Sequence, residues 1–201
     1  MNYLQFLTHK ANGAVKRLIL VFYPSAFPQN KGQLPDDPQM LALYPYCKGL
    51  GIDVGCGSKK THPSALGVDL TPKGEIGKYG SENRQISQAN ITTSGDNLYM
   101  FADSVLDYVV ARHNLEHYTD PIKTLKEWKR VLKVGGTLGI IVPDDAAYDS
   151  IKADPTHKHA FTQESMKNMI ETIGGFKINK LYPLPSHQSF VIIAKRTKNA
   201  N

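Results

Sequence analysis

The sequence predicts an α/β fold, an open sheet of about seven mostly parallel strands with helices on both faces. Continuous apolar runs at 106–111, 138–142 and 190–194 are typical of strands that are buried on both faces. From residue 49 onward, strand-like and helix-like segments alternate, and two strand-like segments end the chain. With 201 residues, 41% of them apolar, the chain can form one well-buried domain with a short appendage.

The N-terminal segment shows the period of an amphipathic helix, because apolar residues recur every three to four positions, at Leu4, Leu7, Ala11, Ala14 or Val15, and Leu18. We expect this helix to pack on the domain or to cover its active site. The alternative is a helix on a membrane surface, with peripheral contact made by residues 1–23. The longest apolar run is far shorter than the roughly 20 residues of a membrane span, so no transmembrane helix is predicted.

The remaining elements follow in order. Asp37-Pro38 predicts the start of a short helix, since Asp caps free N–H groups and Pro suits the first helical position. The expected strands are residues 50–54, 65–70, 86–91, 106–112, 137–142, 176–182 and 190–195, and the expected longer helices are residues 121–132 and 162–173. Trp128 lies at an apolar helix position and is expected in the core. We therefore divide the chain into an N-terminal helical extension or lid, 1–46, and an α/β domain, 47–201.

Charge and cysteine content restrict the partners. The 24 basic and 18 acidic residues give a net charge of +6, but the basic residues are scattered rather than clustered. This pattern disfavours nucleic acid as a partner and fits a small, anionic substrate. Two cysteines form neither a disulfide framework nor a four-cysteine zinc site, so a reducing cytoplasmic location is expected. The oligomeric state is left open.

A glycine-rich turn follows the first predicted strand. Gly55 and Gly57 permit positive φ and let a ligand approach the backbone, at the sheet edge where nucleotide-like ligands bind. Asp69 ends the second strand, where an acid can bind both ribose hydroxyls. The third glycine of a dinucleotide fingerprint is replaced by Lys60, and the phosphate-loop pattern is absent. Asp53, just before the glycines, favours a positively charged or amine-bearing ligand.

This combination resembles class I S-adenosylmethionine-dependent methyltransferases. Segments 107–117, 119–121, 125–136 and 140–144 are similar to the methyltransferase type 11 pattern, and segments 157–161 and 174–176 are similar to a bacterial subgroup. The resemblance implies a Rossmann-like fold, S-adenosyl-L-methionine as cofactor, and methyl transfer to an oxygen or nitrogen. The acceptor it suggests is a small molecule or a precursor of a cell-surface glycan or lipid, with RNA or protein as the alternative.

The resemblance also implies roles for individual residues. It places Asp53, Gly55, Cys56 and Gly57 around the methionine part of the cofactor, Asp69 on the ribose, Asn90 or Asp96 at the adenine, and Ala111 and Arg112 beside the cofactor. A base that takes the acceptor's proton is expected to be a histidine. His113 or His117 is the first choice, followed by His157 and Asp144.

A competing interpretation comes from the segment 113–117. It matches the His-x-x-Glu-His motif of inverted zinc proteases, which would make the protein a zinc-dependent hydrolase using His113, Glu116 and His117. The motif directly follows a predicted buried strand, and no motif for a third ligand is evident. We therefore expect no metal, and we interpret Glu116 as an anchor for backbone N–H groups.

Overall fold

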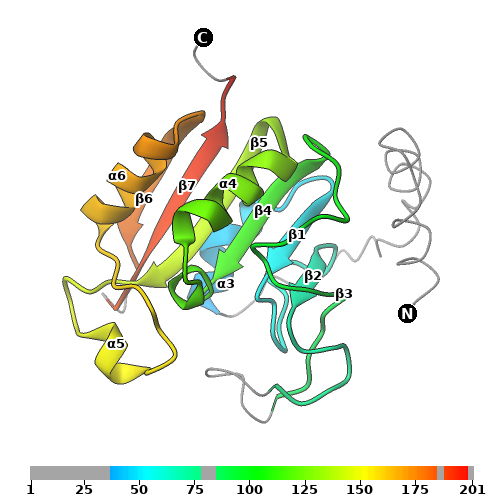
Figure 1. The fold of residues 1–201 in the computed structure, drawn as a ribbon, viewed down its shortest axis with the longest axis horizontal. Helices are drawn as coiled ribbons and strands as arrows, with labels where there is room; N and C mark the ends of the chain where they lie inside the picture. The colour runs from blue at the N-terminus through cyan, green and yellow to red at the C-terminus, as the bar shows by residue number, and fades with distance from the viewer. Residues whose placement is uncertain (1–36, 78–84, 185–187, 199–201) are drawn as a thin grey trace.

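The computed structural model describes residues 37–77, 85–184 and 188–198 (Figure 1). The amphipathic helix and the membrane contact expected within residues 1–23 lie outside these residues. Among the described residues, no helix has the length and apolar character needed to cross a membrane.

A seven-stranded sheet forms the centre of the molecule, in the order β3-β2-β1-β4-β5-β7-β6. The strands are β1 Gly51–Val54, β2 Leu66–Asp69, β3 Ile91–Thr92, β4 Leu106–Arg112, β5 Leu132–Pro143, β6 Phe176–Pro183 and β7 Ser189–Arg196. Neighbours among β1 to β5 are parallel, whereas β7 runs antiparallel to both β5 and β6. The predicted fold class, a mostly parallel open α/β sheet, is confirmed.

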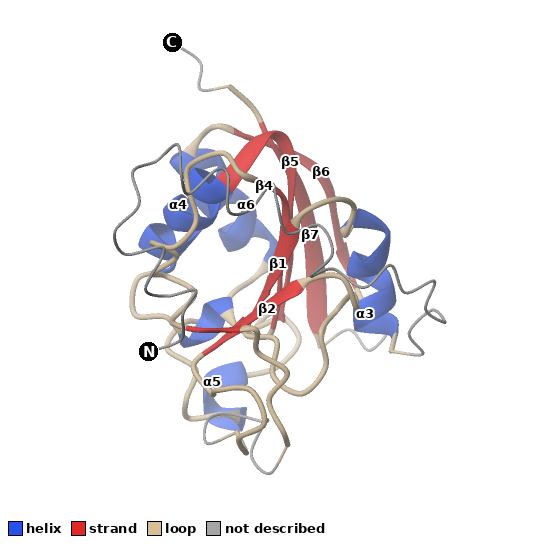
Figure 2. Cartoon of the chain, turned by 90° about the vertical axis from the view of Figure 1, so that its right-hand side faces the viewer, coloured by secondary structure: helices blue, strands red, loops and turns tan. Residues whose placement is uncertain are grey.

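Helices cover both faces of the sheet (Figure 2). The helices α4, Pro121–Val131, and α6, Gln163–Ile173, pack on one face, and α3, Pro38–Leu43, packs on the other. The helices α3 and α4 begin at Asp-Pro pairs, and the side chains of Asp37 and Asp120 cap their first N–H groups. Trp128 on α4 is fully buried, as expected.

The third predicted strand is shorter than expected and lies later in the chain. Within 86–91, Ile86 forms an isolated antiparallel bridge with Ile76 and is 62% exposed. The Ser87 hydroxyl then donates to the Thr71 carbonyl and accepts from the Ala89 N–H, which holds this stretch as a loop. Pairing with β2 begins only at Ile91. The apolar pattern at 86–91 was too weak a signal to distinguish a strand from this bridged loop.

Short connections bring several loops to the carboxyl ends of the parallel strands. No α-helix forms in the described connections 55–65 and 93–105, and a single 3-10 turn, η4 Leu115–His117, follows β4. In Figure 1 the arrowheads of β4 and β5 point to the same side of the molecule, where the short helix α5, Ser150–Ala153, lies. This edge holds the candidate site.

Candidate active site

A cavity of about 540 Å³ opens at the carboxyl ends of the strands. Its wall comes from the ends of β1, β2, β3 and β4, and from the segment after α5: Gly55, Val68 to Thr71, Thr93 to Asp96, His113, Asn114, His117 to Asp120, Lys123, Thr156 and Lys158. Cavities of this size hold small molecules and cofactors in proteins generally.

Asp69, at the end of β2, is held rigidly in the wall. Its Oδ2 accepts a hydrogen bond from the Gly57 N–H at 3.0 Å, and its Oδ1 accepts one from the Thr71 N–H at 2.9 Å. Gly55 lies beside it with φ of +66°, and a side chain there would collide with the Asn114 amide. The carboxylate therefore keeps a fixed direction and has further lone pairs for a hydroxyl ligand.

Asp96 lines the same cavity after β3. Its Oδ1 accepts from the Ser94 hydroxyl, and its Oδ2 lies 3.7 Å from the Lys123 ammonium. The loop is fastened to α4, because the Trp128 Nε1–H donates to the Gly95 carbonyl at 2.9 Å. Asp69 and Asp96 thus make the β2–β3 end of the cavity acidic.

The β4 end of the cavity carries two imidazoles, from His113 and His117. His113 has a φ of +47°, an uncommon value for a residue other than glycine, and its Nδ1 lies 3.5 Å from Glu116 Oε1. The Nδ1 of His117 lies 3.1 Å from the Thr156 hydroxyl and 3.3 Å from the Thr156 carbonyl oxygen. Lys158 lines the cavity nearby, and its ammonium donates to the Thr119 hydroxyl.

The side chains of Asp53 and Arg112 contact the loop at 59–61 instead of lining the cavity. Asp53 is buried and accepts from the Thr61 N–H, and burial raises the pKa of its carboxyl. Arg112 donates to the Lys59 carbonyl at 2.6 Å and to the Thr61 hydroxyl at 3.2 Å, and it pairs with Asp37 at 3.5 Å. Neither side chain lines the cavity. Both fix the loop at 59–61, so their expected roles beside the cofactor stay predictions.

Besides His157, five more of the expected cofactor or catalytic residues lie outside the cavity wall, and one of them is Gly57, whose N–H donates to Asp69. Asn90 accepts from the Gly67 N–H at 2.9 Å and thereby supports β2. Asp144 is buried and accepts from the Ala146 N–H at 3.2 Å. Cys56 and Ala111 are buried, and burial raises the pKa of the Cys56 thiol.

His157 lies behind the cavity wall, with its ring centroid 4.8 Å from that of His117. Glu116 is fully buried, and neither of its carboxylate oxygens accepts a hydrogen bond from a described residue. The interpretation of Glu116 as an anchor for backbone N–H groups is therefore wrong.

The structure also adds wall residues that the sequence did not indicate. Among them are Asn114, Tyr118, Lys123, Thr156 and Lys158. The Tyr118 hydroxyl donates to the Asn114 side chain at 2.8 Å, which orders the turn after β4. For the segment that carries Thr156 and Lys158, the sequence offered one signal. His157 and His159 on either side of Lys158 indicate a polar loop.

Comparison with known proteins relates the sequence to a protein family. Residues 52–140 match the family model described as "Methyltransferase domain". These residues form a class I S-adenosylmethionine-dependent methyltransferase domain. No curated protein matches the chain in sequence.

Solved structures share the fold of this methyltransferase at low identity. A putative methyltransferase from Bacillus halodurans has a TM-score of 0.60 and 16% identity, over 82% of this chain and 100% of the other. A S-adenosylmethionine-dependent methyltransferase from Archaeoglobus fulgidus has a TM-score of 0.55 and 20% identity, over 97% of this chain and 100% of the other. A S-adenosylmethionine-dependent methyltransferase from Thermotoga maritima, described as a possible histamine N-methyltransferase, has a TM-score of 0.57 and 18% identity, over 80% of this chain and 88% of the other.

The residues of the cavity fit S-adenosylmethionine, the cofactor of this methyltransferase. Asp69 presents a fixed carboxylate with free lone pairs, as the two ribose hydroxyls require. Gly55 in the wall has a positive φ, and a Cβ there would collide with the Asn114 side chain, which also lines the cavity. The acidic end formed by Asp69 and Asp96 also suits a ligand that carries amino and sulfonium groups.

Proposed function

We propose that this methyltransferase methylates an oxygen or nitrogen of a small, anionic acceptor, such as a precursor of a cell-surface glycan or lipid. One observation carries the proposal. The cavity that presents Asp69 and Asp96 at its β2–β3 end presents His113, His117 and Lys158 at its β4 end. Proton acceptors and a cation therefore line the same cavity as the two acidic side chains that we assign to the cofactor.

In the proposed reaction, different residues of the chain bind the cofactor, take a proton and bind the acceptor. S-adenosylmethionine supplies an activated methyl group on a sulfonium. Asp69 holds the ribose end, so that the reacting groups meet in a fixed orientation, which can supply much of the rate. His113 or His117 takes the proton that an acceptor hydroxyl or amine loses. Lys158 attracts negative charge on the acceptor, and Lys123 is partly neutralised by Asp96 at 3.7 Å.

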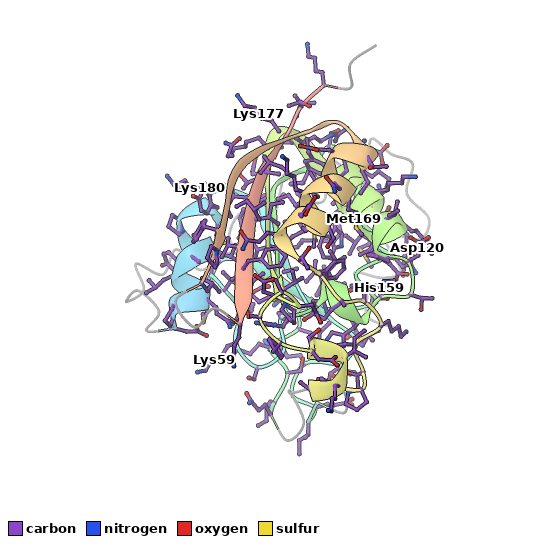
Figure 3. All side chains as sticks on the ribbon, turned by 90° about the vertical axis from the view of Figure 1, so that its left-hand side faces the viewer. Lys59, Asp120, His159, Met169, Lys177 and Lys180 are labelled. Carbon is purple, nitrogen blue, oxygen red and sulfur yellow. The ribbon has the colours of Figure 1, made fainter. Side chains whose placement is uncertain are left out.

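The distribution of basic residues supports a small acceptor over RNA. In Figure 3 Lys59 lies apart from Lys177 and Lys180, which both belong to β6. An RNA-binding surface would collect such charges in one patch or groove. RNA methylation remains an outcome of the test below.

The test is transfer of a labelled methyl group to a panel of phosphorylated sugars, lipid precursors, amines and RNA. We expect a small anionic acceptor to be methylated, with His113→Ala or His117→Ala lowering kcat roughly 10²- to 10⁴-fold. Methylation of RNA alone, with binding that weakens steeply as salt rises, would contradict the proposal.

Asp69→Asn separates loss of the cofactor from loss of acceptor chemistry. We expect it to weaken S-adenosylhomocysteine binding roughly 10- to 100-fold in calorimetry, because a charged hydrogen-bond acceptor is lost. The histidine variants should bind S-adenosylhomocysteine nearly as the wild type does. Asp103→Asn, at an exposed ion pair with Arg130, serves as the matched control.

A further inference from the structure

We infer that Glu116, His117 and His157 form a binding site for a divalent transition-metal ion behind the β4 end of the cavity. Each offers one ligand atom, and these atoms lie within 4.8 Å of one another. The residues come from two segments, the turn η4 and the stretch that follows α5. The Lys158 and His159 N–H groups both donate to the Glu116 carbonyl, at 2.8 and 3.2 Å, and this holds His157 beside Glu116.

Glu116 gives the first independent reason for an ion. Its side chain is fully buried, and both carboxylate oxygens lack a hydrogen-bond partner among the described residues. Burying a carboxylate without a partner costs several kcal/mol generally, so such groups are paired or bound to metal. The neighbouring imidazole nitrogens, His113 Nδ1 at 3.5 Å and His157 Nε2 at 4.0 Å, stand too far away for a short hydrogen bond.

The two histidines give the second reason. The Nδ1 of His117 faces the Thr156 carbonyl oxygen at 3.3 Å and can donate its proton there. That bond would leave Nε2 unprotonated, which is the arrangement of most histidines that bind metal. The side chain of His157 is only 9% exposed, and its Nδ1 has no hydrogen-bond partner among the residues described.

The donor set indicates the class of ion. Two imidazoles and one carboxylate suit zinc and the neighbouring first-row metals, whereas magnesium and calcium prefer oxygen ligands alone. Bonds of about 2.0–2.2 Å place the ligand atoms of a tetrahedral zinc site roughly 3.4 Å apart. Glu116 Oε1 and His157 Nε2, now 4.0 Å apart, would have to approach by about 0.6 Å, and atoms at the 4.8 Å limit of the set by about 1.4 Å.

The position of the site suggests its use. His117 belongs both to the ligand set and to the cavity wall, so an ion here would lie next to the acceptor and would leave His113 as the base. Three protein ligands leave a coordination position open, as in catalytic zinc sites, and a bound hydroxyl would become more acidic. This role rests on the proposed function, whereas binding of the ion itself does not.

The experiment measures zinc and cobalt binding to the full chain after metal has been removed with a chelator. We expect one zinc ion per chain after desalting, and a visible absorption band for the cobalt form. Zinc at about 100 times its Kd should raise the Tm by roughly 5–10 °C.

Glu116→Gln and His117→Ala should each weaken zinc binding about 100-fold or more. His159→Ala is the matched control, since His159 (labelled in Figure 3) contacts the Thr119 carbonyl oxygen and lies outside the ligand set.

Two results decide between a metal site and ion pairs between Glu116 and protonated histidines. A metal site predicts that the metal-free Glu116→Gln variant has a Tm equal to or above that of the wild type, because a buried unpaired charge is removed. A lower Tm together with no zinc binding by the wild type would overturn the inference, as would equal binding by wild type and variants. If Glu116→Gln does not fold, His117→Ala decides, because it alters a partly exposed side chain. S-adenosylhomocysteine binding is measured in parallel, so failure of the metal site is distinguished from failure of the methyltransferase function.

Discussion

At the scale of single residues, acidic side chains at neighbouring strand ends have different tasks. Asp53 in β1 and Asp69 in β2 lie in adjacent parallel strands, yet only Asp69 lines the cavity. Asp53 is turned to the Thr61 N–H and the loop that replaces a helix between these strands. The sequence shows both acids beside the glycine turn, but it does not show which way each side chain turns. That direction depends on the partner that the folded loop offers.

The buried position of Asp53 predicts a dependence of stability on pH. Burial raises the pKa of this carboxyl above 3.8, its value in an exposed aspartate. Below pH 3.8 the carboxyl is protonated in both the folded and the unfolded chain. As the pH rises through the raised pKa of the folded state, the wild type loses stability, because the unfolded chain releases the proton more readily.

The matched variant for this test is Asp53→Asn, which keeps an acceptor for the Thr61 N–H without the charge. Its unfolding free energy relative to the wild type should increase between pH 4 and pH 8 in urea titrations. Asp103→Asn, at a position 76% exposed, should show no such trend. A constant difference between wild type and Asp53→Asn across this range would contradict the prediction.

At the scale of elements, α4 orders a loop that has no helix of its own. Glu127 accepts from the Leu98 N–H, Trp128 donates to the Gly95 carbonyl, and Arg130 donates to the carbonyls of Leu98 and Phe101. Three side chains of one helix thus satisfy backbone groups across 95–101. Since Gly95 and Asp96 line the cavity, α4 supports this part of the wall, to which its first turn also contributes Lys123.

Trp128→Phe tests this support. The variant keeps an aromatic ring in the core but removes the donor to the Gly95 carbonyl, at a cost of about 1–3 kcal/mol. We expect S-adenosylhomocysteine affinity to fall several-fold in calorimetry, because the loop that carries Asp96 loses its fixed position. Leu125→Val, a buried change on the same helix, should lower stability by a similar amount without altering affinity. Equal affinities in both variants would show that the Gly95 contact does not order the site.

The helices and most strands could be predicted because their signals are local. Asp-Pro pairs mark the starts of α3 and α4, and continuous apolar runs mark β4, β5 and β7. Carboxyl ends of parallel strands meet at one edge, so Asp69 and His113 could be expected in one cavity. The contact between Glu116 and the stretch around His157 could not be predicted. It joins positions about 40 residues apart through a loop whose backbone bonds depend on the folded sheet.

At the scale of the whole molecule, the helices that the structure describes cover the two faces of the sheet unequally. One face packs against the two 11-residue helices α4 and α6, whereas α3, with six residues, covers the other. Leu43 of α3 is fully buried beside Val110 and Ile141 of the sheet. Leu43 packs directly over Gly139 in β5, because a Cβ at Gly139 would lie 2.9 Å from the Leu43 Cδ2.

This imbalance predicts that the stability of the whole chain depends strongly on Leu43. Leu43→Ala should lower the free energy of unfolding by about 2–5 kcal/mol in urea, because a buried side chain is removed and the short helix has no other fully buried residue. Leu41→Ala, on the same helix but 39% exposed, should cost about 1 kcal/mol or less. Both variants should unfold in a single transition if the faces share one cooperative core. Equal effects of the two substitutions would mean that α3 contributes little to the fold, and a second transition for Leu43→Ala would mean that the α3 face unfolds independently of the α4–α6 face.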